Sequence, residues 1–206
     1  MAKITVSILN ADYGHMQDFV DSMSNADAIQ FDVMDGHFVP NLTMGPEMVR
    51  CIKTNLFKEV HLMVTNPSLF VKPFSDAGVD RIIFHVEVKE NIDKVIKLIR
   101  KESKQVGLAV SMKTPIKKVL PYLKKVDMLI IMPITPGFGG QAFNPKVLDK
   151  IKTIRKISGI EIQADGGIND LTGRQCIDAG ADNLLVGTFI SRSKNPRETV
   201  EILKKL

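Results

Sequence analysis

The sequence has few aromatic residues and lacks the largest of them. It contains no tryptophan, two tyrosines and ten phenylalanines, and its lysines are spread over many segments with few aromatic side chains between them. Proteins that bind nucleic acids usually combine a clustered basic surface with a recognised motif or a platform of aromatic rings. The chain shows neither, so we expect no nucleic-acid partner.

Cysteine and long apolar runs are also scarce. Cys51 and Cys176 stand alone, without a Cys-x-x-Cys pair, which excludes a disulfide framework and is typical of a reducing cytosol. No apolar stretch reaches the length of a membrane span, and the N-terminus enters a strand-like run without a basic region and a signal-type apolar core. We therefore expect a cytoplasmic protein with no membrane partner.

The composition that is present is that of an ordinary globular protein. The 206 residues are 44% hydrophobic and 25% charged, which suits one domain over residues 1–206 with a sizeable core. The formal net charge of +5 suits anionic partners. Because the positive charges are dispersed, small phosphorylated ligands fit better than nucleic acid. We also expect a homo-oligomer.

Short apolar runs alternate with amphipathic segments along the whole chain. The expected strands are residues 4–9, 28–33, 59–64, 81–86, 106–111, 128–132, 160–164 and 183–186. Each is followed by a plausible helix, most clearly at 91–101 and 146–157, where apolar residues recur on one helical face.

A repeated turn shows that these units are alike. Asp-Ala-Gly-Val-Asp at 76–80 and Asp-Ala-Gly-Ala-Asp at 178–182 each place glycine where a helix stops, just before a strand. About eight strand-helix units in a chain of this length predict an α/β fold of the (β/α)8 TIM-barrel type. A doubly wound open sheet is the alternative.

The strand at 28–33 carries an unusual polar pair. Gln30 and Asp32 alternate with apolar residues, so both polar side chains share one face of the strand. An unpaired carboxylate in a low-dielectric interior loses several kcal/mol of hydration. A metal, a basic partner or a solvent-filled pocket must compensate Asp32, and each of these describes a site. For Asp35, a turn at Asp35-Gly36 is the favoured interpretation.

In a barrel, the carboxyl ends of the strands form the active face. The polar residues expected at or near those ends are Ser7, Asp32, His61, His85 and Asp165. For His85, and more weakly for Ser7, a hydrogen-bonded structural role is favoured. The methionines near strand ends are Met34, Met63 and Met132. Core filling is their usual role, and a thioether layer against a flat, electron-rich intermediate is the alternative.

Glycines gather after the last three strands. Residues 136–141 contain three glycines in four positions, and further glycines follow Asp165 and the last strand. Glycine-rich turns let backbone N–H groups approach an anion closely, and barrels commonly bind phosphate among their last βα loops. We expect a phosphate cradle built from Gly137, Gly139, Gly140, Gly166, Gly167, Gly187 and Thr188.

These motifs together resemble the ribulose-phosphate 3-epimerase family. They are Ser-Ile-Leu at 7–9, Phe-Asp-Val-Met-Asp-Gly-His-Phe-Val-Pro-Asn at 31–41, His-Leu-Met-Val at 61–64, His-Val-Glu at 85–87, Pro-Gly-Phe-Gly-Gly-Gln at 136–141, Asp-Gly-Gly at 165–167 and Gly-Thr at 187–188. The resemblance implies a TIM barrel that uses a divalent metal to interconvert ketopentose phosphates, ribulose 5-phosphate and xylulose 5-phosphate, at C3.

The resemblance also assigns roles to individual residues. It implies Asp32 and Asp165 as the acid/base pair, and Asp32, His61, Asp165 and the residue at position 30 as metal ligands for zinc, iron or manganese. Ser7, His61, the three methionines, Phe138 and the glycine loops are implied as substrate-binding residues. Two carboxylates on opposite faces can remove and return a proton without rotating the intermediate, and a metal can stabilise the enediolate.

The chain departs from the family at the site itself. Gln30 stands where the motif has a histidine, and an amide oxygen is a poorer zinc ligand than imidazole. Residues 111–113 and 133–135 also differ from the expected Asn-Pro-x and Thr-Val-Asn. A hexulose phosphate such as allulose 6-phosphate is therefore an alternative substrate, and a barrel that binds sugar phosphate without turnover is another. The related decarboxylase and hexulose-phosphate synthase group is disfavoured because 61–65 lacks its Asp-x-Lys-x-x-Asp motif.

Overall fold

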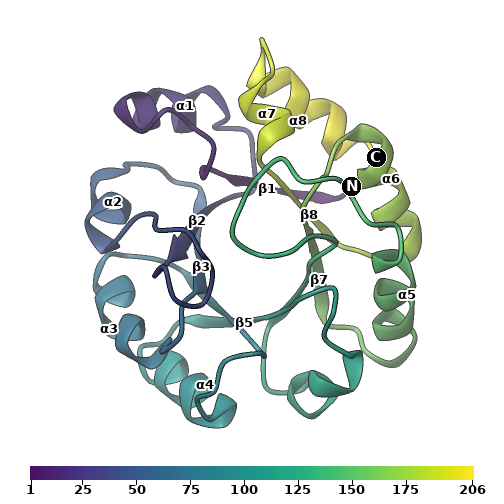
Figure 1. Ribbon diagram of the computed structural model, residues 1–206. Coiled ribbons are helices and arrows are strands. Elements are labelled where there is room, and N and C mark those ends of the chain that lie inside the picture. Colours follow the sequence, from purple (N-terminus) through teal and green to yellow (C-terminus); the bar gives the residue numbers. More distant parts are fainter.

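The eight expected strands form a closed parallel barrel. In the computed structural model, which describes residues 1–206, each strand pairs with its neighbours in chain order and the last strand closes the ring against the first (Figure 1). The strands are β1 Lys3–Ser7, β2 Ala28–Met34, β3 Phe57–Met63, β4 Arg81–His85, β5 Gln105–Val110, β6 Met128–Ile131, β7 Glu161–Asp165 and β8 Asn183–Val186. The TIM-barrel prediction is confirmed, and strand limits differ from those expected by no more than two residues.

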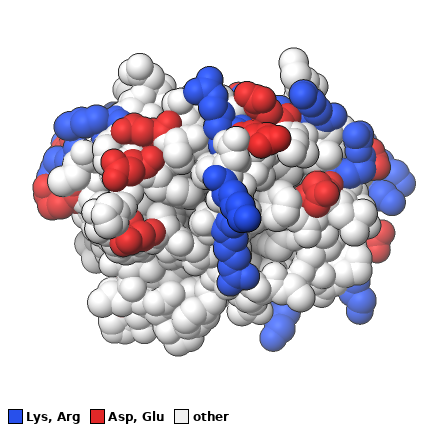
Figure 2. Space-filling view, turned by 90° about the horizontal axis from the view of Figure 1, so that it is seen from above, with Lys and Arg blue, Asp and Glu red and all other residues white.

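Helices surround the barrel on the outside (Figure 1). They are α1 Met16–Ser22, α2 Pro46–Cys51, α3 Ser68–Asp76, α4 Ile92–Lys101, α5 Val147–Ile157, α6 Asp170–Ala179, α7 Thr188–Ser191 and α8 Pro196–Lys204. None of them has the length and apolar character needed to cross a bilayer. The face shown in Figure 2 carries basic and acidic side chains side by side.

The expectation that every strand is followed by a helix is wrong at one place. Between β5 and β6 the chain forms only two short 3-10 turns, η2 Ile116–Lys118 and η3 Leu120–Tyr122, while η1 Tyr13–His15 precedes α1. Pro115 and Pro121 lie in this connection. Proline has no backbone N–H and crowds the preceding turn, which disfavours an α-helix in this connection. A single proline, Pro73, is accommodated within α3.

The repeated turns have a structural role at the amino-terminal end of the barrel. Gly78 and Gly180 adopt left-handed φ angles of +89° and +108° after α3 and α6, as helix stops require. The aspartate before each even-numbered strand then accepts a hydrogen bond from a backbone N–H at the start of the preceding odd-numbered strand, at 2.6 to 2.8 Å. These residues are Asp27, Asp80, Asp127 and Asp182. The barrel is thus built from four similar pairs of βα units.

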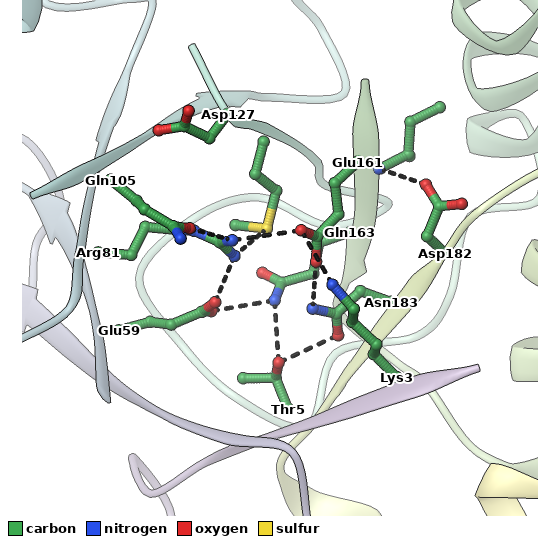
Figure 3. Close-up of polar contacts among 12 residues, drawn as sticks. Lys3, Thr5, Glu59, Arg81, Gln105, Asp127, Glu161, Gln163, Asp182 and Asn183 are labelled. Atoms are coloured by element: carbon green, nitrogen blue, oxygen red, sulfur yellow. Dashed lines mark hydrogen bonds and ion pairs between the residues drawn. The ribbon is translucent and has the colours of Figure 1, made fainter. Parts of the chain in front are cut away.

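A polar network fills the amino-terminal end of the barrel interior (Figure 3). Arg81 donates to Glu59 at 2.6 Å, and Gln163 donates to Glu59 at 3.1 Å and to Thr5 at 3.2 Å. Thr5 in turn donates to Asn183 at 3.0 Å. Hydrogen bonding compensates these buried polar groups for lost hydration. The network closes the end of the barrel opposite the expected site.

The side of the barrel interior that faces the polar side chains of β1, β2, β3 and β7 is apolar. It consists of Ile83, Ala109, Met128, Ile130 and Met132, on β4 to β6 and just after it. Gly107 is required there because a Cβ at this position would lie 2.5 Å from the Ile83 side chain. Polar side chains on β1, β2, β3 and β7 therefore face a hydrophobic wall.

Candidate active site

A cavity of about 700 Å³ opens at the carboxyl ends of the strands. The predicted site residues that line it are Ser7, Asp32, Met34, Met63, Met132, Gly137, Phe138, Gly139, Gly140, Asp165, Gly166, Gly167, Gly187 and Thr188. Gln30 and His61 do not line the cavity, because both are fully buried beneath Asp32. The structure thus brings the predicted residues together at one site in two layers.

Asp32 is held by donors from two strands. Alternation along β2 turns Gln30 and Asp32 into the barrel, and both side chains are buried. Ser7 Oγ donates to Asp32 Oδ2 at 2.6 Å, and Gln30 Nε2 donates to Asp32 Oδ1 at 2.9 Å. Hydrogen bonds to both oxygens fix the orientation of this carboxylate. Ser7 therefore orients Asp32 and also faces the cavity.

His61 lies between the two carboxylates. It is the neighbour of Asp32 in the β2–β3 ladder, and its Nδ1 is 3.2 Å from Asp32 Oδ1 and 3.7 Å from Asp165 Oδ2. Burial disfavours the charged imidazolium, but the hydrogen bond to Asp32 and the charges of Asp32 and Asp165 outweigh it and raise the pKa of His61. A positive charge is therefore favoured between the two aspartates.

Asp165 ends β7 and faces Asp32 across the cavity floor. Burial, followed by repulsion from the Asp32 charge, raises the pKa of Asp165 to about 7, although His61 opposes the rise. A carboxyl group with this pKa can hold or release a proton at neutral pH, which an acid/base catalyst must do.

A second histidine lies behind the first. His85 Nε2 is 2.9 Å from His61 Nε2, and His85 Nδ1 is 3.0 Å from Glu87 Oε2. Burial lowers the pKa of His85 to about 4, and the hydrogen bond from His85 helps to lower the pKa of Glu87 to about 2 against the effect of burial. His85 is thus hydrogen-bonded, as expected from the sequence, but its partner is a site residue.

The methionines form part of the cavity wall. Met34 and Met63 pack with Val39, and Met132 belongs to the apolar wall on β4 to β6. All three are at most 3% exposed while lining the cavity. Core filling and contact with a ligand are therefore compatible at these positions.

Two glycine positions after β7 cannot carry a side chain. Gly166 and Gly167 have φ angles of +128° and +66°. A Cβ on Gly167 would lie 2.8 Å from the backbone nitrogen of Phe143, and one on Gly166 would overlap Ile134. The β6–α5 connection therefore packs directly on the β7 loop, which draws the glycine loops together around one end of the cavity.

Sequence reasoning missed several residues that line this end of the cavity. Asn10 donates to Thr188 Oγ1 at 2.8 Å and so joins the β1 and β8 loops. Arg192, just after α7, is the cationic residue of the lining. Their signals were weak: Asn10 directly follows the Ser-Ile-Leu motif, and Arg192 lies four residues beyond Gly-Thr.

Three side chains beneath the cavity carry atoms of the kind that bind a divalent cation. No three carboxylate, imidazole or thiol groups are already arranged as a metal cluster. His61 Nδ1 nevertheless lies within 4 Å of a carboxylate oxygen of both Asp32 and Asp165, which gives two oxygens and one nitrogen. Gln30 Oε1 is buried without a hydrogen-bond partner and is a third oxygen, on the side chain whose Nε2 contacts Asp32 and His61. Such an oxygen-rich set suits manganese or magnesium better than zinc.

The fold and the cavity define an α/β barrel with two aspartates, Asp32 and Asp165, on a cavity that is lined by glycines from three loops. The chain belongs to the Ribulose-phosphate 3 epimerase family, whose model matches residues 3–191. Curated relatives named ribulose-phosphate 3-epimerase include those of Mycobacterium bovis, 37% identical over 98% of this chain and 91% of the relative, and Chlamydia muridarum, 39% identical over 98% and 94%. The resemblance inferred from the sequence is confirmed.

Solved structures support the fold. The 3-hexulose-6-phosphate synthase of Salmonella typhimurium has a TM-score of 0.78 at 17% identity and covers 98% of this chain and 97% of its own. KGPDC from Streptococcus mutans has a TM-score of 0.78 at 15% identity, with 100% and 96% covered. At these identities the similarity shows a shared barrel and does not extend to the reaction.

Proposed function

We propose that this protein is an isomerase that inverts C3 of a ketose phosphate, interconverting ribulose 5-phosphate and xylulose 5-phosphate. The observation that supports the proposal is the placement of Asp32 and Asp165 on one cavity with His61 between them, at 3.2 and 3.7 Å from their oxygens. A substrate carbon between the carboxylates can lose a proton to one and gain a proton from the other.

The proton transfers follow from the state of each carboxylate. With Asp32 ionised and Asp165 protonated, Asp32 removes the C3 proton and Asp165 returns one to the opposite face. The reverse reaction starts with the proton on Asp32. The positive charge favoured at His61 stabilises the enediolate oxygen electrostatically. A divalent metal held by Asp32, His61 and Asp165, with Gln30 Oε1 as a weak fourth ligand, would add Lewis-acid stabilisation of the same charge.

The glycine-rimmed end of the cavity suits the phosphate group. Backbone N–H groups of the loops after β6, β7 and β8 are close together there, and Arg192 adds a positive charge at the rim. A small phosphorylated ketose is therefore the proposed ligand. A cytoplasmic location and a homo-oligomeric state remain parts of the proposal, the first supported by the free thiols of Cys51 and Cys176.

A hexulose phosphate such as allulose 6-phosphate is the second candidate substrate. Ile134 lies in the 133–135 segment that departs from the family, and it lines the cavity against Gly166. A changed wall can change the length of sugar that fits. The test is C3 proton exchange in D2O over a panel of pentulose and hexulose phosphates. Exchange without a preference for ribulose 5-phosphate would favour the second candidate, and no exchange with any of them would reject the enzyme.

The pH dependence tests the shared proton. The active free enzyme carries one proton on the pair of carboxylates Asp32 and Asp165. The pKa of Asp165 of about 7 sets the pH above which this proton is lost. We expect kcat/KM to fall by about tenfold per pH unit above that value. The forward and reverse reactions should show the same fall in kcat/KM at high pH. The enzyme forms that start them differ only in which of the two aspartates carries the proton. A flat profile to about pH 9 would contradict a protonated Asp165.

The phosphate end can be tested with Gly187→Val. A Cβ at Gly187 would meet Ser7 Cβ at 3.5 Å, so the methyl groups of valine crowd the backbone donors. We expect the Kd for ribulose 5-phosphate to rise by about tenfold, the scale of one hydrogen bond to a charged group. Gly159→Val is the matched control, because a Cβ there meets nothing within 4 Å. An unchanged Kd in a folded Gly187→Val protein would exclude this loop from phosphate binding.

A further inference from the structure

We propose that Glu87 and His85 are positioning residues that hold His61 with a proton on Nε2, so that His61 Nδ1 always faces Asp32 and Asp165. The inference rests on the proposed function, which makes those aspartates the acid/base pair. The carrying observation is a continuous buried chain: Glu87 Oε2 to His85 Nδ1 at 3.0 Å, His85 Nε2 to His61 Nε2 at 2.9 Å, and His61 Nδ1 to Asp32 Oδ1 at 3.2 Å.

The donor and acceptor properties of the side chains fix the direction of donation along this series of hydrogen bonds. The Glu87 carboxylate only accepts, so His85 Nδ1 carries the proton of that hydrogen bond. A neutral His85 then has a bare Nε2, which must accept from Nε2–H of His61. Neutral His85 is the favoured form, because the ring is fully buried. His85 therefore sets the tautomer of His61.

Glu87 is itself held by the loop after β5. Ser111 N donates to Glu87 Oε1 at 2.9 Å. Lys150, from α5, donates to the carbonyl oxygens of Ser111, Met112 and Thr114 at 3.0, 2.6 and 2.7 Å and so fixes this loop. Glu87 is therefore held by a backbone N–H group of this loop, and Lys150 fixes the loop.

The hydrogen-bonded series Glu87–His85–His61, here called the relay, affects the carboxylates of Asp32 and Asp165. If His61 Nε2 always carries a proton, then a bare Nδ1 would face Asp32 Oδ1 at 3.2 Å as one acceptor against another. Two acceptors at that distance repel each other unless a proton or a cation lies between them. The relay therefore keeps a positive charge, either an imidazolium or a bound metal, next to both aspartates, where an enediolate would form.

Glu87→Gln is the decisive variant because it reverses the direction of hydrogen-bond donation between residue 87, His85 and His61. The backbone N–H of Ser111 selects the amide oxygen, as it now selects Glu87 Oε1, so the amide NH2 turns toward His85 Nδ1. His85 must then carry its proton on Nε2 and donate to His61, which moves the proton of His61 to Nδ1. Nitrogen-15 NMR of histidine distinguishes these tautomers directly, and the chain has only four histidines. Variants of the exposed His15 and His37 assign the other two signals.

We expect His61 to be protonated at Nε2 in the parent protein, both after chelation and with added zinc, and at Nδ1 in Glu87→Gln. kcat should fall by about tenfold with little change in KM, the lower end of the effect of losing an outer-shell partner. Glu90→Gln is the matched control. It makes the same change three residues away, where Glu90 binds Ser68 through a backbone N–H and a hydroxyl, and it should leave tautomer and kcat unchanged.

The outcomes separate this inference from the proposed function. A parent His61 that lacks a proton on Nε2 would overturn the relay even if Glu87→Gln failed to fold. An unchanged His61 tautomer in a folded Glu87→Gln protein would also overturn it, as would a kcat equal to that of the parent. The tautomer is read without substrate, so a parent protein with the expected tautomer but no epimerase activity would reject the proposed function and leave the relay standing.

Discussion

Asp32→Asn and Asp165→Asn should each lower epimerisation by about 10²-fold or more, the scale expected for loss of a positioned acid or base. An amide can neither remove the C3 proton nor return it. Both side chains line the cavity, and no other carboxylate does, so no neighbour can take over the lost role. The measurement is the rate of conversion between ribulose 5-phosphate and xylulose 5-phosphate.

Proton exchange makes this prediction sharper. Each single variant retains one carboxylate, so it should still exchange the C3 proton of the epimer whose proton faces that carboxylate, and should not exchange the other. The two variants should therefore have opposite substrate preferences in D2O. Asp178→Asn, an exposed change on α6, is the control and should behave as the parent. Near-parent epimerisation in either active-site variant would show that the two-carboxylate mechanism is wrong.

Gln30→His should raise zinc affinity by roughly 10- to 100-fold, a scale borrowed from the loss of outer-shell metal partners. The structure places residue 30 correctly for this effect. Gln30 Nε2 is 2.9 Å from Asp32 Oδ1 and 3.5 Å from His61 Nδ1. Imidazole nitrogen is a better zinc donor than an amide oxygen, so the substitution converts an oxygen-rich set into one that zinc prefers.

Chelator competition on the parent and the variant measures the affinity, alongside epimerase assays with and without added metal. Gln30→Leu is the control at the same position, because it also removes the amide hydrogen bond to Asp32 but adds no ligand. Its zinc affinity should not rise. Equal zinc affinity in Gln30→His and the parent would mean that residue 30 does not reach the cation, and the metal site carried over from the family would have to be abandoned.

The departure at Gln30 has a simple structural account. A histidine there would bring a second nitrogen ligand or a further charge beside His61, whereas the amide donates to Asp32 and leaves Oε1 without a partner. The amide thus contributes a hydrogen bond that orients the Asp32 carboxylate. The positive charge near the aspartates then depends more on His61, and so on the residues that hold it.

The sequence by itself determined the barrel and predicted that Asp32 belongs to a site. Period-two alternation in β2 showed that Gln30 and Asp32 point inward, because a strand turns successive side chains to opposite faces. Glycine at the ends of α3 and α6 marked the repeated unit, because only glycine enters the left-handed stop at low cost. Strand alternation and helix termination are local properties, because they depend on residues that are adjacent in the sequence. The family motifs extended them to Asp165 and the glycine loops.

Only the tertiary structure decided how the side chains meet. His61 lies on β3 and Glu87 follows the end of the neighbouring strand β4, and their link through His85 depends on side-chain distances that no spacing in the sequence encodes. The layering of Gln30 and His61 beneath Asp32 and the anchoring of Glu87 by Lys150 are of the same kind. Hydrogen bonds require distances near 3 Å and aligned donors, so β2, β3 and β4 had to pair in register before the contacts among Asp32, His61 and His85 existed.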